Sequence, residues 1–413
     1  MNKPKIVILG AGFGGIYTYL HLRKKLKPSE ADIILVNKTN HFLFTPMLHE
    51  VATGGLGHHQ IVESLREIIY DSDTNLYVAN IESVDFDAKK VHTNVGDINF
   101  DYLVIATGAT TNFYNIPGAK ENAFTIKSLG EAIKLRNYFI DNFEKASKVK
   151  DAKERKKLLS FAIVGGGATG VEVAGEASDF FYKTFCKYYC QDIEAGDVNL
   201  YIINRGPELL PQFNPYLRKK ALKALTKKKV QIKLNSSVTS IEKDHIQLSS
   251  GETLPVNNVI WTAGVKANPP KINQEIPTDS SGRLKVNQHL QIKGHPHIFA
   301  LGDVASYEHQ SGKALPMLAQ VAVQQSKTVA NNIAASIQQK PLKSFKYHSK
   351  GELVSIGQWG ALGHTLGVNW SGPIAWWLWR TVYLFKFISS SKKIKIAIDW
   401  TVNLFHHRDI TRA

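Results

Sequence analysis

The chain has 413 residues, and 43% of them are hydrophobic, which is enough for two compact domains and a smaller appendage. Lysine and arginine number 51 against 35 acidic residues, and the formal charge of +16 suits an anionic membrane surface or a nucleic acid. No zinc-finger, RNA-recognition or helix-turn-helix signature occurs, which argues against a nucleic-acid partner, and only two cysteines are present, which excludes a disulfide scaffold.

The first predicted unit is a strand, a glycine-rich turn and a helix at the N-terminus. Residues 6–9 are apolar and read as a buried parallel strand, and residues 16–26 read as a helix. Between them, Gly10 permits a tight turn, Gly12 lets a pyrophosphate approach the backbone, and Gly15 lets the helix pack on the strand. The positive end of the helix dipole also attracts phosphate, so this turn predicts a dinucleotide site.

The second strand, residues 32–36, is followed by Asn37 and Lys38. Dinucleotide folds usually carry an acid at this place to hold a ribose hydroxyl. Asn37 can still accept one hydrogen bond, so its presence weakens the case for an adenosine site without excluding it. Residues 41–55 are apolar and contain Pro46, and they are interpreted either as a buried loop or as a cover for a flavin.

The next stretch predicts antiparallel strands at residues 76–86 and 89–94, and a further strand at 100–106. The last strand stops at Thr107 and Gly108, which leaves backbone groups available near a cofactor. A charged helix over 129–150 and a solvated connection over 151–157 then mark a domain boundary.

The strand, glycine turn and helix then occur a second time. Residues 161–164 form the strand, Gly165, Gly167 and Gly170 repeat the spacing, and residues 171–181 form the helix. Two dinucleotide sites in one chain predict a permanently held flavin and a visiting nicotinamide nucleotide.

The second strand of the repeat, residues 199–203, also lacks the acid, because Asn204 and Arg205 follow it. A missing carboxylate removes the repulsion that excludes a 2′-phosphate, and Arg205 offers a partner for one. The sequence therefore leaves both NADH and NADPH open. A later strand, 259–265, ends in small residues.

Two further signals precede the C-terminal region. The strand in residues 298–303 delivers Asp303 to its carboxyl end, where ligands bind in open α/β sheets, although Asp303 could equally cap a helix. A helix begins within 316–325 and carries Gln320 and Gln324 on one face. Unpaired amides are costly in an apolar setting, so these two are either surface residues or ligand contacts.

The C-terminal region is basic and amphipathic. Residues 373–388 are rich in aromatics but contain Arg380 and Lys386, and no window reaches the ~18 apolar residues that a spanning helix needs. A helical stripe of apolar residues follows, formed by Ile394, Ile398, Val402 and Phe405. We interpret the region as a helix lying in a membrane interface, with Trp376, Trp377, Trp379 and Trp400 at the lipid boundary. A core-packing helix and a dimer interface are the alternatives.

These motifs resemble type II NADH:quinone dehydrogenases, which are single-subunit, non-proton-pumping flavoenzymes of the membrane surface. The resemblance covers essentially the full length and rests on GAGFGG, HFLFTPMLHEVATG, DYLVIATGA, GGGATGVEVAGE, VIWTAGVKA, IFALGDVA, AQVAVQ and the aromatic C-terminus. It implies an α/β fold of two Rossmann-like domains of the flavoprotein disulfide reductase type plus a C-terminal amphipathic anchor. The implied domains are an FAD-binding domain (1–115 and 290–340), an NAD(P)H-binding domain (116–289) and an interface and anchor region (341–413).

The resemblance also implies the activity and its site residues. The chain would hold FAD, oxidise NADH or NADPH, and reduce a membrane quinone. It would bind peripherally to an anionic surface at the cytoplasmic face of the cell membrane, with a homodimer as one assembly that the resemblance allows. Residues carried to FAD are Gly10, Gly12, Gly14, Gly15, Asn37, Lys38, Thr45, Pro46, Ala106, Thr107, Gly108, Gly302, Asp303 and Ala319. Residues carried to the nicotinamide nucleotide are Gly165, Gly167, Gly170, Asn204, Ala263 and Gly264. Gln320 and Gln324 would line the quinone pocket, and Glu172, interpreted as lying in the first helical turn, would organise the nicotinamide site or relay protons.

Other activities on the same fold need residues that this chain lacks or places elsewhere. A flavin disulfide reductase, like a sulfide:quinone reductase, needs cysteines beside the flavin, whereas Cys186 and Cys190 lie elsewhere and no cysteine occurs in the first domain. Four zinc ligands are not visible, so no metal is expected. An NADPH-preferring quinone reductase and a membrane-tethered redox sensor that binds FAD with little turnover remain as alternatives.

Overall fold

The computed structural model describes residues 3–70, 74–308, 312 and 314–412. The chain divides into two compact units, each described here by itself. Unit 1 combines ranges 1–43, 63–110 and 265–349, and unit 2 combines 44–62, 111–264 and 350–413. The segment from residue 350 onward is part of unit 2 in this division. The functional domain boundaries expected from the sequence remain a prediction.

Unit 1 is built on a six-stranded sheet in the order β22-β23-β9-β1-β2-β5. Its strands run in parallel except for the β22–β23 pair. Their bounds are β1 Lys5–Leu9, β2 Asp32–Asn37, β5 Asn75–Val78, β9 Tyr102–Ile105, β22 Gln291–Ile292 and β23 His295–Ala300. Residues 6–9 of β1 are fully buried, as the continuous apolar run predicts for a central parallel strand.

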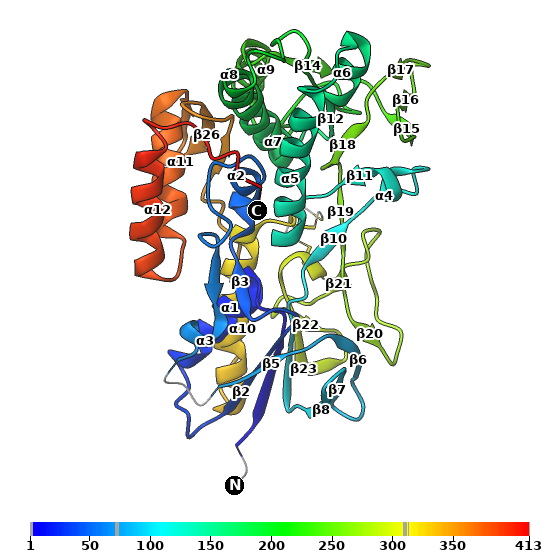
Figure 1. The fold of residues 1–413 in the computed structure, drawn as a ribbon. Coiled ribbons are helices and arrows are strands. Elements are labelled where there is room, and N and C mark those ends of the chain that lie inside the picture. The colour runs from blue at the N-terminus through cyan, green and yellow to red at the C-terminus, as the bar shows by residue number, and fades with distance from the viewer. Residues whose placement is uncertain (1–2, 71–73, 309–311, 313, 413) are drawn as a thin grey trace. The chain divides into compact units, whose positions relative to one another are not determined.

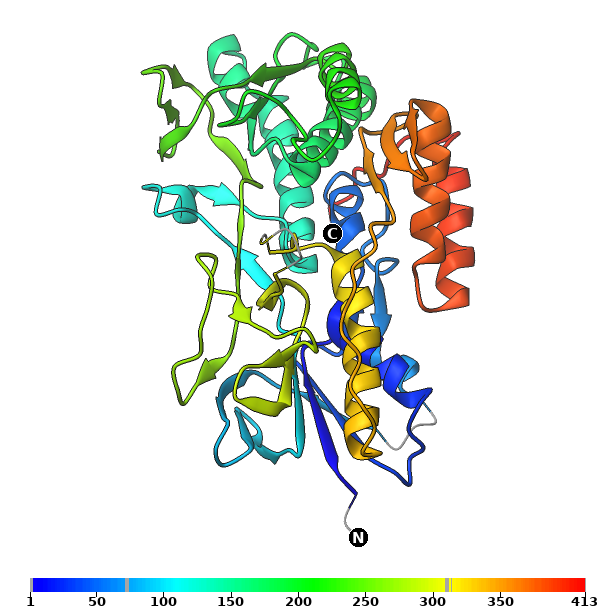
Figure 2. The same ribbon diagram turned by 180° about the vertical axis from the view of Figure 1, so that it is seen from behind.

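Two helices of unit 1 lie side by side, as Figures 1 and 2 show: α1 (Phe13–Arg23) and α10 (Ala319–Ile337). The extended segment after α10 runs back beside it (Figure 2), held where the Asn332 side chain bonds the backbone of Lys343. Helix α1 begins at Phe13, three residues before the start that the sequence predicts.

The segment 76–86 was expected to be one strand and is two, so that prediction is wrong. β5 joins β2 in the parallel sheet, whereas β6 (Ile81–Asp85) pairs antiparallel with β7 (Lys90–Thr93) in a second sheet. The break follows from the backbone N–H of Ala79, which bonds the carbonyl of Asn37 and ends the parallel ladder. The remaining elements lie in unit 1, except that β4 and β10 each include a unit boundary of the chain. They are β3 His41–Leu43, β4 Val62–Ser64, α3 Leu65–Ile68, β8 Gly96–Asn99, β10 Ala109–Thr111, β19 Val265–Ala267, β20 Lys271–Ile272, β21 Leu284–Lys285, the 3-10 turn η3 Gly302–Val304 and β24 Ala305–Ser306.

Unit 2 repeats the same topology with a five-stranded parallel sheet in the order β11-β18-β12-β13-β14. The run β18-β12-β13-β14 matches β9-β1-β2-β5 of unit 1, which is the structural form of the repeated glycine motif. The strands are β11 Ala123–Phe124, β12 Ser160–Val164, β13 Asn199–Ile203, β14 Val230–Lys233 and β18 Asn258–Trp261. The helices are α2 Leu48–Ala52, α4 Ala119–Asn122, α5 Leu129–Ala146, α6 Ala152–Leu158, α7 Ala168–Ser178, α8 Cys186–Tyr188 and α9 Pro215–Lys227.

Two local expectations in unit 2 are corrected. The connection expected at 151–157 is solvated, since α6 contains no buried residue, but it is helical because Asp151 caps it by accepting a hydrogen bond from the backbone N–H of Glu154. The helix after the second glycine motif does not continue regularly to residue 181, since α7 changes into a π-helix, η2 (Asp179–Phe185). The short remaining elements are η1 Thr45–Met47, β15 Val238–Ile241, β16 Ile246–Leu248 and β17 Thr253–Leu254.

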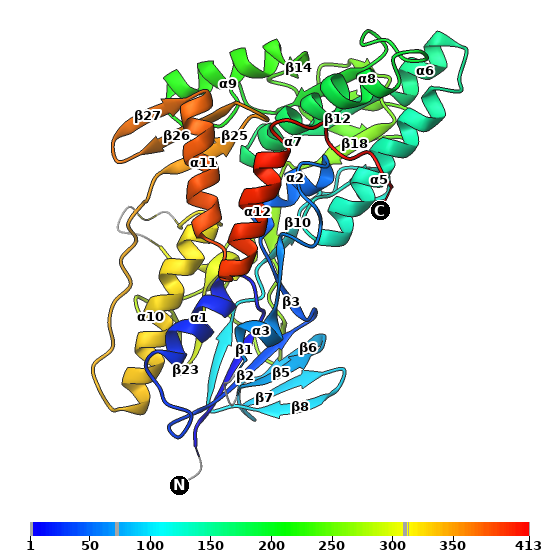
Figure 3. The ribbon, with the colours of Figure 1, turned by 60° about the vertical axis from the view of Figure 1, so that its left-hand side comes forward.

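The C-terminal part of unit 2 contains a three-stranded antiparallel sheet and two helices, α11 (Pro373–Phe385) and α12 (Ser390–Val402), which lie side by side in Figure 3. The strands are β25 Glu352–Ser355, β26 Ala361–Thr365 and β27 Val368–Ser371. Searched over the described residues, the structure contains no helix that is long and apolar enough to cross a membrane.

Three of the four tryptophans expected at a lipid boundary lie inside the protein instead. Trp376, Trp379 and Trp400 are buried, and only Trp377 is about half exposed, at 48%. The reason is Arg380, whose guanidinium lies 3.7 Å from the ring centre of Trp376 and 4.8 Å from that of Trp400. Stacking on these two rings stabilises the guanidinium charge, and the aromatics of both helices pack on each other.

The apolar stripe, by contrast, is exposed to solvent. Ile394 is 63% and Ile398 56% exposed, while Ile396 and Trp400 on the opposite face of α12 are buried. The stripe is therefore not the face of α12 that packs on the interior, whereas the opposite face is. The core-packing alternative thus holds for one face of this helix and not for the stripe.

The close packing of the first glycine turn gives a testable prediction. A Cβ atom on Gly15 would overlap the carbonyl oxygen of Gly10, whereas a Cβ atom on Gly12 would meet nothing within 4 Å. We expect Gly15→Ala to lower the free energy of unfolding by ~3 kcal/mol, and Gly12→Ala to change it by less than ~0.5 kcal/mol. Thermal unfolding of the flavin-stripped variants measures both, and equal midpoints for the two would contradict the packing argument.

Candidate functional site

The first glycine turn is braced by Asn37. Gly10 adopts φ +94° and its N–H bonds the carbonyl of Val36, while the N–H of Ala11 bonds the Asn37 side-chain oxygen at 3.0 Å. The Asn37 amide nitrogen donates to the carbonyl and hydroxyl of Thr39. The oxygen that we expected to be offered to a ribose thus holds the turn in place.

Other residues carried to the flavin gather at the same edge of the unit 1 sheet, because β1, β9 and β23 are neighbours and end together. After β9, the Thr107 hydroxyl donates to the carbonyl of Asn268 at 2.7 Å, and the N–H of Asn268 donates to the carbonyl of Gly108. After β23, the N–H of Gly302 donates to the side-chain oxygen of Gln325 at 2.7 Å. Sequence reasoning did not single out Gln325. An amide on an apolar helix face was the available signal, because a buried amide needs a hydrogen-bond partner.

The remaining predicted flavin residues occupy several elements. Lys38 is exposed after β2, Asp303 lies in η3, and Ala319 opens α10. Thr45 and Pro46 form η1 and belong to unit 2.

The two glutamines of α10 have different surroundings. The Gln324 amide both donates to the carbonyl of His348, at 2.9 Å, and accepts from its N–H, at 3.1 Å. Gln324 thus ties the extended segment after α10 to the helix. Gln320 is half-buried one turn earlier. The quinone-lining role of both remains a prediction.

The second glycine turn is braced in the same way. Gly165 adopts φ +118°, and the N–H of Gly166 bonds the side-chain oxygen of Asn204 at 3.1 Å. The Asn204 amide nitrogen donates to the carbonyls of Gly206 and Glu208. Asn37 and Asn204 therefore occupy equivalent places and do equivalent work in the two sheets.

The other nucleotide residues surround this turn. Ala263 follows β18, and its backbone lies close to Gly165. A Cβ atom on Gly165 would come within 2.8 Å of the Ala263 backbone. The Thr262 hydroxyl, just before it, donates to the carbonyl of Val164. Gly264 adjoins Tyr114, whose ring fills the space that a side chain there would need.

Glu172 does not lie in the first turn of its helix, so that expectation is corrected. α7 begins at Ala168, which places Glu172 in the second turn, facing the interior of unit 2. One of its oxygens lies 3.8 Å from Nδ1 of His49, and the other accepts a long, 3.5 Å hydrogen bond from the N–H of Ser355. The helix-dipole role proposed for it therefore does not apply.

Glu172 is one of four buried groups that we call the buried acid cluster: His49, Glu50, Glu172 and Glu176. Glu50 accepts a hydrogen bond from the indole N–H of Trp400 at 3.0 Å. Glu176 forms an ion pair with Arg408 and accepts from the Ser355 hydroxyl at 3.3 Å. Sequence reasoning singled out only Glu172 of these four, because α2 and α7, which carry them, are distant in the chain and meet only through packing.

The cluster has strongly altered protonation. Burial raises the pKa of Glu50 to about 7, with Glu176 adding to the rise, and burial raises the pKa of Glu172 well above its usual range. Burial also lowers the pKa of His49 to about 4. Burial acts to raise the pKa of Glu176 as well, but Arg408 outweighs it and the pKa is lowered. Near neutral pH we therefore expect Glu172 protonated, Glu176 ionised, His49 neutral and Glu50 titrating.

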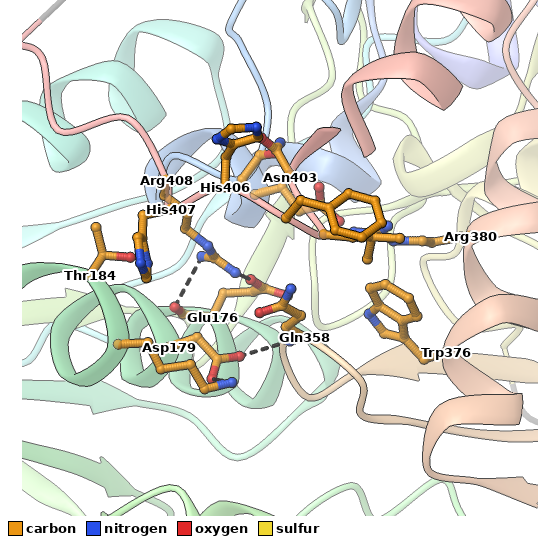
Figure 4. A pocket seen from close by; sticks show the side chains of 15 residues that line it. Glu176, Asp179, Thr184, Gln358, Trp376, Arg380, Asn403, His406, His407 and Arg408 are labelled. Carbon is orange, nitrogen blue, oxygen red and sulfur yellow. Dashed lines mark hydrogen bonds and ion pairs between the residues drawn. The ribbon is translucent and has the colours of Figure 1, made fainter. Parts of the chain in front are cut away.

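A cavity of about 170 Å³ adjoins the cluster in unit 2, and Figure 4 shows most of its wall. The C-terminal tail, residues 403–408, forms one side, and the π-helix η2 contributes another. π-helices often mark functional sites, and here the irregular turn carries Asp179 to the cavity wall, where it binds Lys183 and Lys228. The lining residues are Glu50, Gly55, Glu176, Asp179, Lys183, Thr184, Gln358, Trp376, Arg380, Asn403, Leu404, Phe405, His406, His407 and Arg408.

His49, Glu50 and Glu176 offer potential ligand atoms within 4.8 Å of one another. Two guanidinium groups already supply positive charge here, since Arg408 pairs with Glu176 and Arg380 acts on Glu50. A divalent cation would have to compete with both. The chemistry of the site therefore favours proton exchange between carboxyl groups and an imidazole.

The chain is similar in sequence to known families and proteins over nearly its whole length. Residues 4–326 match the family model described as pyridine nucleotide-disulphide oxidoreductase, and residues 349–409 match the NDH2 C-terminal domain. The chain is 33% identical to demethylphylloquinone reductase NdbB of Synechocystis, covering 96% of each chain. It is 30% identical to the type II NADH:quinone oxidoreductase Ndh of Mycobacterium tuberculosis, covering 98% of this chain and 89% of that one.

The fold matches solved structures over nearly the whole chain. NDH2 of Plasmodium falciparum, solved in complex with NADH, superposes with a TM-score of 0.91 at 24% identity, covering 99% of this chain and 100% of that one. The predicted α/β fold of the flavoprotein disulfide reductase type is confirmed.

The ion pair of Arg408 gives a prediction about stability. Arg408 also donates to the carbonyl and hydroxyl of Thr53, so Arg408→Met would leave Glu176 buried without its partner. We expect the free energy of unfolding at pH 7 to fall by ~3–5 kcal/mol. The matched control is Arg412→Met, because Arg412 pairs with Asp141 at 3.4 Å but is 68% exposed, and its loss should cost less than ~1 kcal/mol. Chemical unfolding measures both changes, and similar losses for the two would contradict the assignment.

Proposed function

The chain belongs to the family of type II NADH:quinone oxidoreductases, and we propose that it oxidises NADH and reduces a membrane quinone through bound FAD. The observation that carries this is the pair of glycine turns, each at the carboxyl edge of a parallel sheet and each braced by an asparagine. The chain is an oxidoreductase with flavin and NADH chemistry, and the reaction of its family involves no proton pumping. The choice of FAD as the flavin is part of the proposal.

The residues present fit a dinucleotide at both turns. A Cβ atom on Gly12, Gly108 or Gly167 would meet nothing within 4 Å, so the backbone is open to a phosphate at each place. Gly12 and Gly167 are also the N-caps of α1 and α7 and provide no side-chain cap, which suits an anion at the helix start. Bound FAD would supply the two-electron chemistry that the amino-acid side chains lack.

The proposed site residues then take distinct roles. The first turn, with Asn37 as its brace, would hold the FAD pyrophosphate, and the second turn would hold the nicotinamide nucleotide. Gln320 would direct its amide to a quinone carbonyl, and Glu172 would relay a proton. Both roles are assigned to these positions because the chain resembles the family there.

For the nucleotide, we propose NADH with slower use of NADPH. Asn204 brings no negative charge to the end of β13, and exposed Arg205 follows it, so a 2′-phosphate meets no carboxylate from these two residues. Preference for NADPH would reverse this order in the same assay.

For the location, we propose peripheral binding at the cytoplasmic face of an anionic membrane, where a lipid-soluble quinone and soluble NADH are both reachable. The exposed stripe of α12, with Trp377 and Phe385 of α11, offers apolar surface, and the lysines at 392, 393 and 395 offer charge. The same surface could meet a second copy of the chain, and a homodimer is the alternative occupant.

The activity proposal is tested on the purified full-length protein. We expect about one FAD per chain after denaturation, rapid NADH oxidation with menadione or a short-chain ubiquinone, and slower oxidation of NADPH. Release of FMN would contradict the cofactor assignment. A flavoprotein that binds NADH but turns over no quinone would favour the redox-sensing alternative.

The membrane proposal is tested with point variants, because the buried tryptophans make a truncation after residue 372 expose the core of unit 2. We expect the full-length protein to bind anionic vesicles and Ile394→Glu with Ile398→Glu to bind at least about tenfold more weakly, since two charges would enter the acyl boundary. Leu222→Glu, at a 40% exposed site on α9, is the matched control. Vesicle sedimentation measures binding, and equal loss in both variants would count against α12 as the membrane-binding element.

A further inference from the structure

We propose that the cavity beneath the C-terminal tail is a proton entry, in which Glu50 takes protons from water and the imidazole of His49 passes them to Glu172. This inference rests on the proposed quinone reduction, which takes up one proton from water for each NADH oxidised. It assigns work to residues outside both glycine turns. Glu50 and His49 are relay residues that act through Glu172.

The path begins at the cavity wall. Glu50 lines the cavity, whose volume of about 170 Å³ and polar lining are sufficient for several water molecules. One of its oxygens accepts from the Trp400 indole, at 3.0 Å, which fixes the carboxyl at the boundary between cavity and interior. A carboxyl in this position can exchange protons with water on one side and reach buried groups on the other.

His49 connects the two carboxyls. A ring nitrogen of His49 and oxygens of Glu50 and Glu176 lie within 4.8 Å of one another, a spacing that one water molecule can bridge. Nδ1 of the same ring lies 3.8 Å from Glu172. Nε2 of His49 is buried and has no hydrogen-bond partner among the described residues. A neutral imidazole accepts a proton at one nitrogen while it releases one from the other, which is the property that a relay needs.

The charges around Glu50 come from several elements. Glu176 of α7 opposes its ionisation, whereas Arg380 of α11, Arg408 of the tail and the Trp400 indole favour it. The balance places its pKa at about 7, so Glu50 is able to take up and release protons near neutral pH. Glu176 is held ionised by Arg408, and its charge stabilises a proton that passes through His49.

Each transfer is balanced. The O–H bond of Glu50 breaks as an N–H bond forms on His49, and the opposite nitrogen releases its proton to the ionised Glu172 that has just given one up. Water in the cavity then reprotonates Glu50. NADH delivers two electrons and one hydrogen as hydride through the flavin, so one such cycle supplies the single further proton that each quinol takes from water.

The competing interpretation is that these groups only dock the tail. Arg408 and Glu176 do that work directly. Docking needs neither a titrating carboxyl at Glu50 nor a second exchangeable nitrogen on His49. A measurement that responds to proton delivery, and not to folding, separates the two.

The test compares two oxidants of the NADH-reduced holoenzyme in stopped flow. Menadione takes two electrons and two protons, whereas ferricyanide takes electrons alone. For Glu50→Gln we expect the ratio of the menadione rate to the ferricyanide rate to fall at least about tenfold at pH 7, with loss of the pH dependence centred near 7. Glu50→Asp keeps the carboxyl and should recover part of the ratio. The matched control is Glu144→Gln, an exposed glutamate of α5, which should keep the wild-type ratio.

His49→Gln provides a second variant that keeps a polar group but removes the exchangeable pair of nitrogens, and the same fall in the ratio is expected. An unchanged ratio and pH profile in Glu50→Gln and His49→Gln would overturn the relay alone. Parallel loss of both rates, with the ratio kept, would assign the cluster to docking and also overturn it. A wild-type enzyme that reduces ferricyanide but no quinone would overturn the proposed function itself.

Discussion

The burial of Arg408 against Glu176 is the interaction on which the interior of unit 2 depends. One guanidinium reaches from the C-terminal tail to α7 and also bonds the end of α2, so three segments from distant parts of the sequence are fixed together. An ion pair this deeply buried gains little net stability compared with apolar packing, but breaking it leaves a bare charge inside the protein. The tail is therefore held in one place, and the position of the cavity and the acid cluster follows from it.

Charge balance explains why so many ionisable groups can share this interior. Glu176 and Asp179 are matched by Arg408, Lys183 and Lys228, and Arg380 is placed between aromatic rings. Two carboxyl groups remain. Glu50 has no cationic partner at ion-pair distance among the described residues, and burial raises the pKa of Glu172 well above its usual range. Proton exchange is the chemistry left available after the structural pairs have been formed, and it matches what quinone reduction requires.

The two glycine turns are stabilised by the same side-chain hydrogen bond. In both sheets an asparagine at the carboxyl end of the second strand accepts from the backbone N–H that follows the first glycine. A neutral amide can brace the turn by both donating and accepting, whereas a carboxylate could only accept. An asparagine in place of the carboxylate removes a negative charge that would select a ribose over a 2′-phosphate. The residue that stabilises the turn thereby also affects the choice of nucleotide.

The sequence by itself determined the fold class, the two glycine turns and the order of strands around them, because glycine spacing and continuous apolar runs act over a few residues. β13 was predicted with its observed bounds, while the split of β5 from β6 and the π-helix after α7 were not. The split is decided by the hydrogen bond from Ala79 to Asn37, two residues that lie far apart in the chain. Only the tertiary structure decided which way side chains point. Glu172 turns toward His49, Trp400 meets Glu50 across 350 positions, and the amides of Asn37 and Gln324 are occupied by backbone groups. Contacts of this kind join residues whose local sequences carry no sign of each other, so packing alone brings the acid cluster into being.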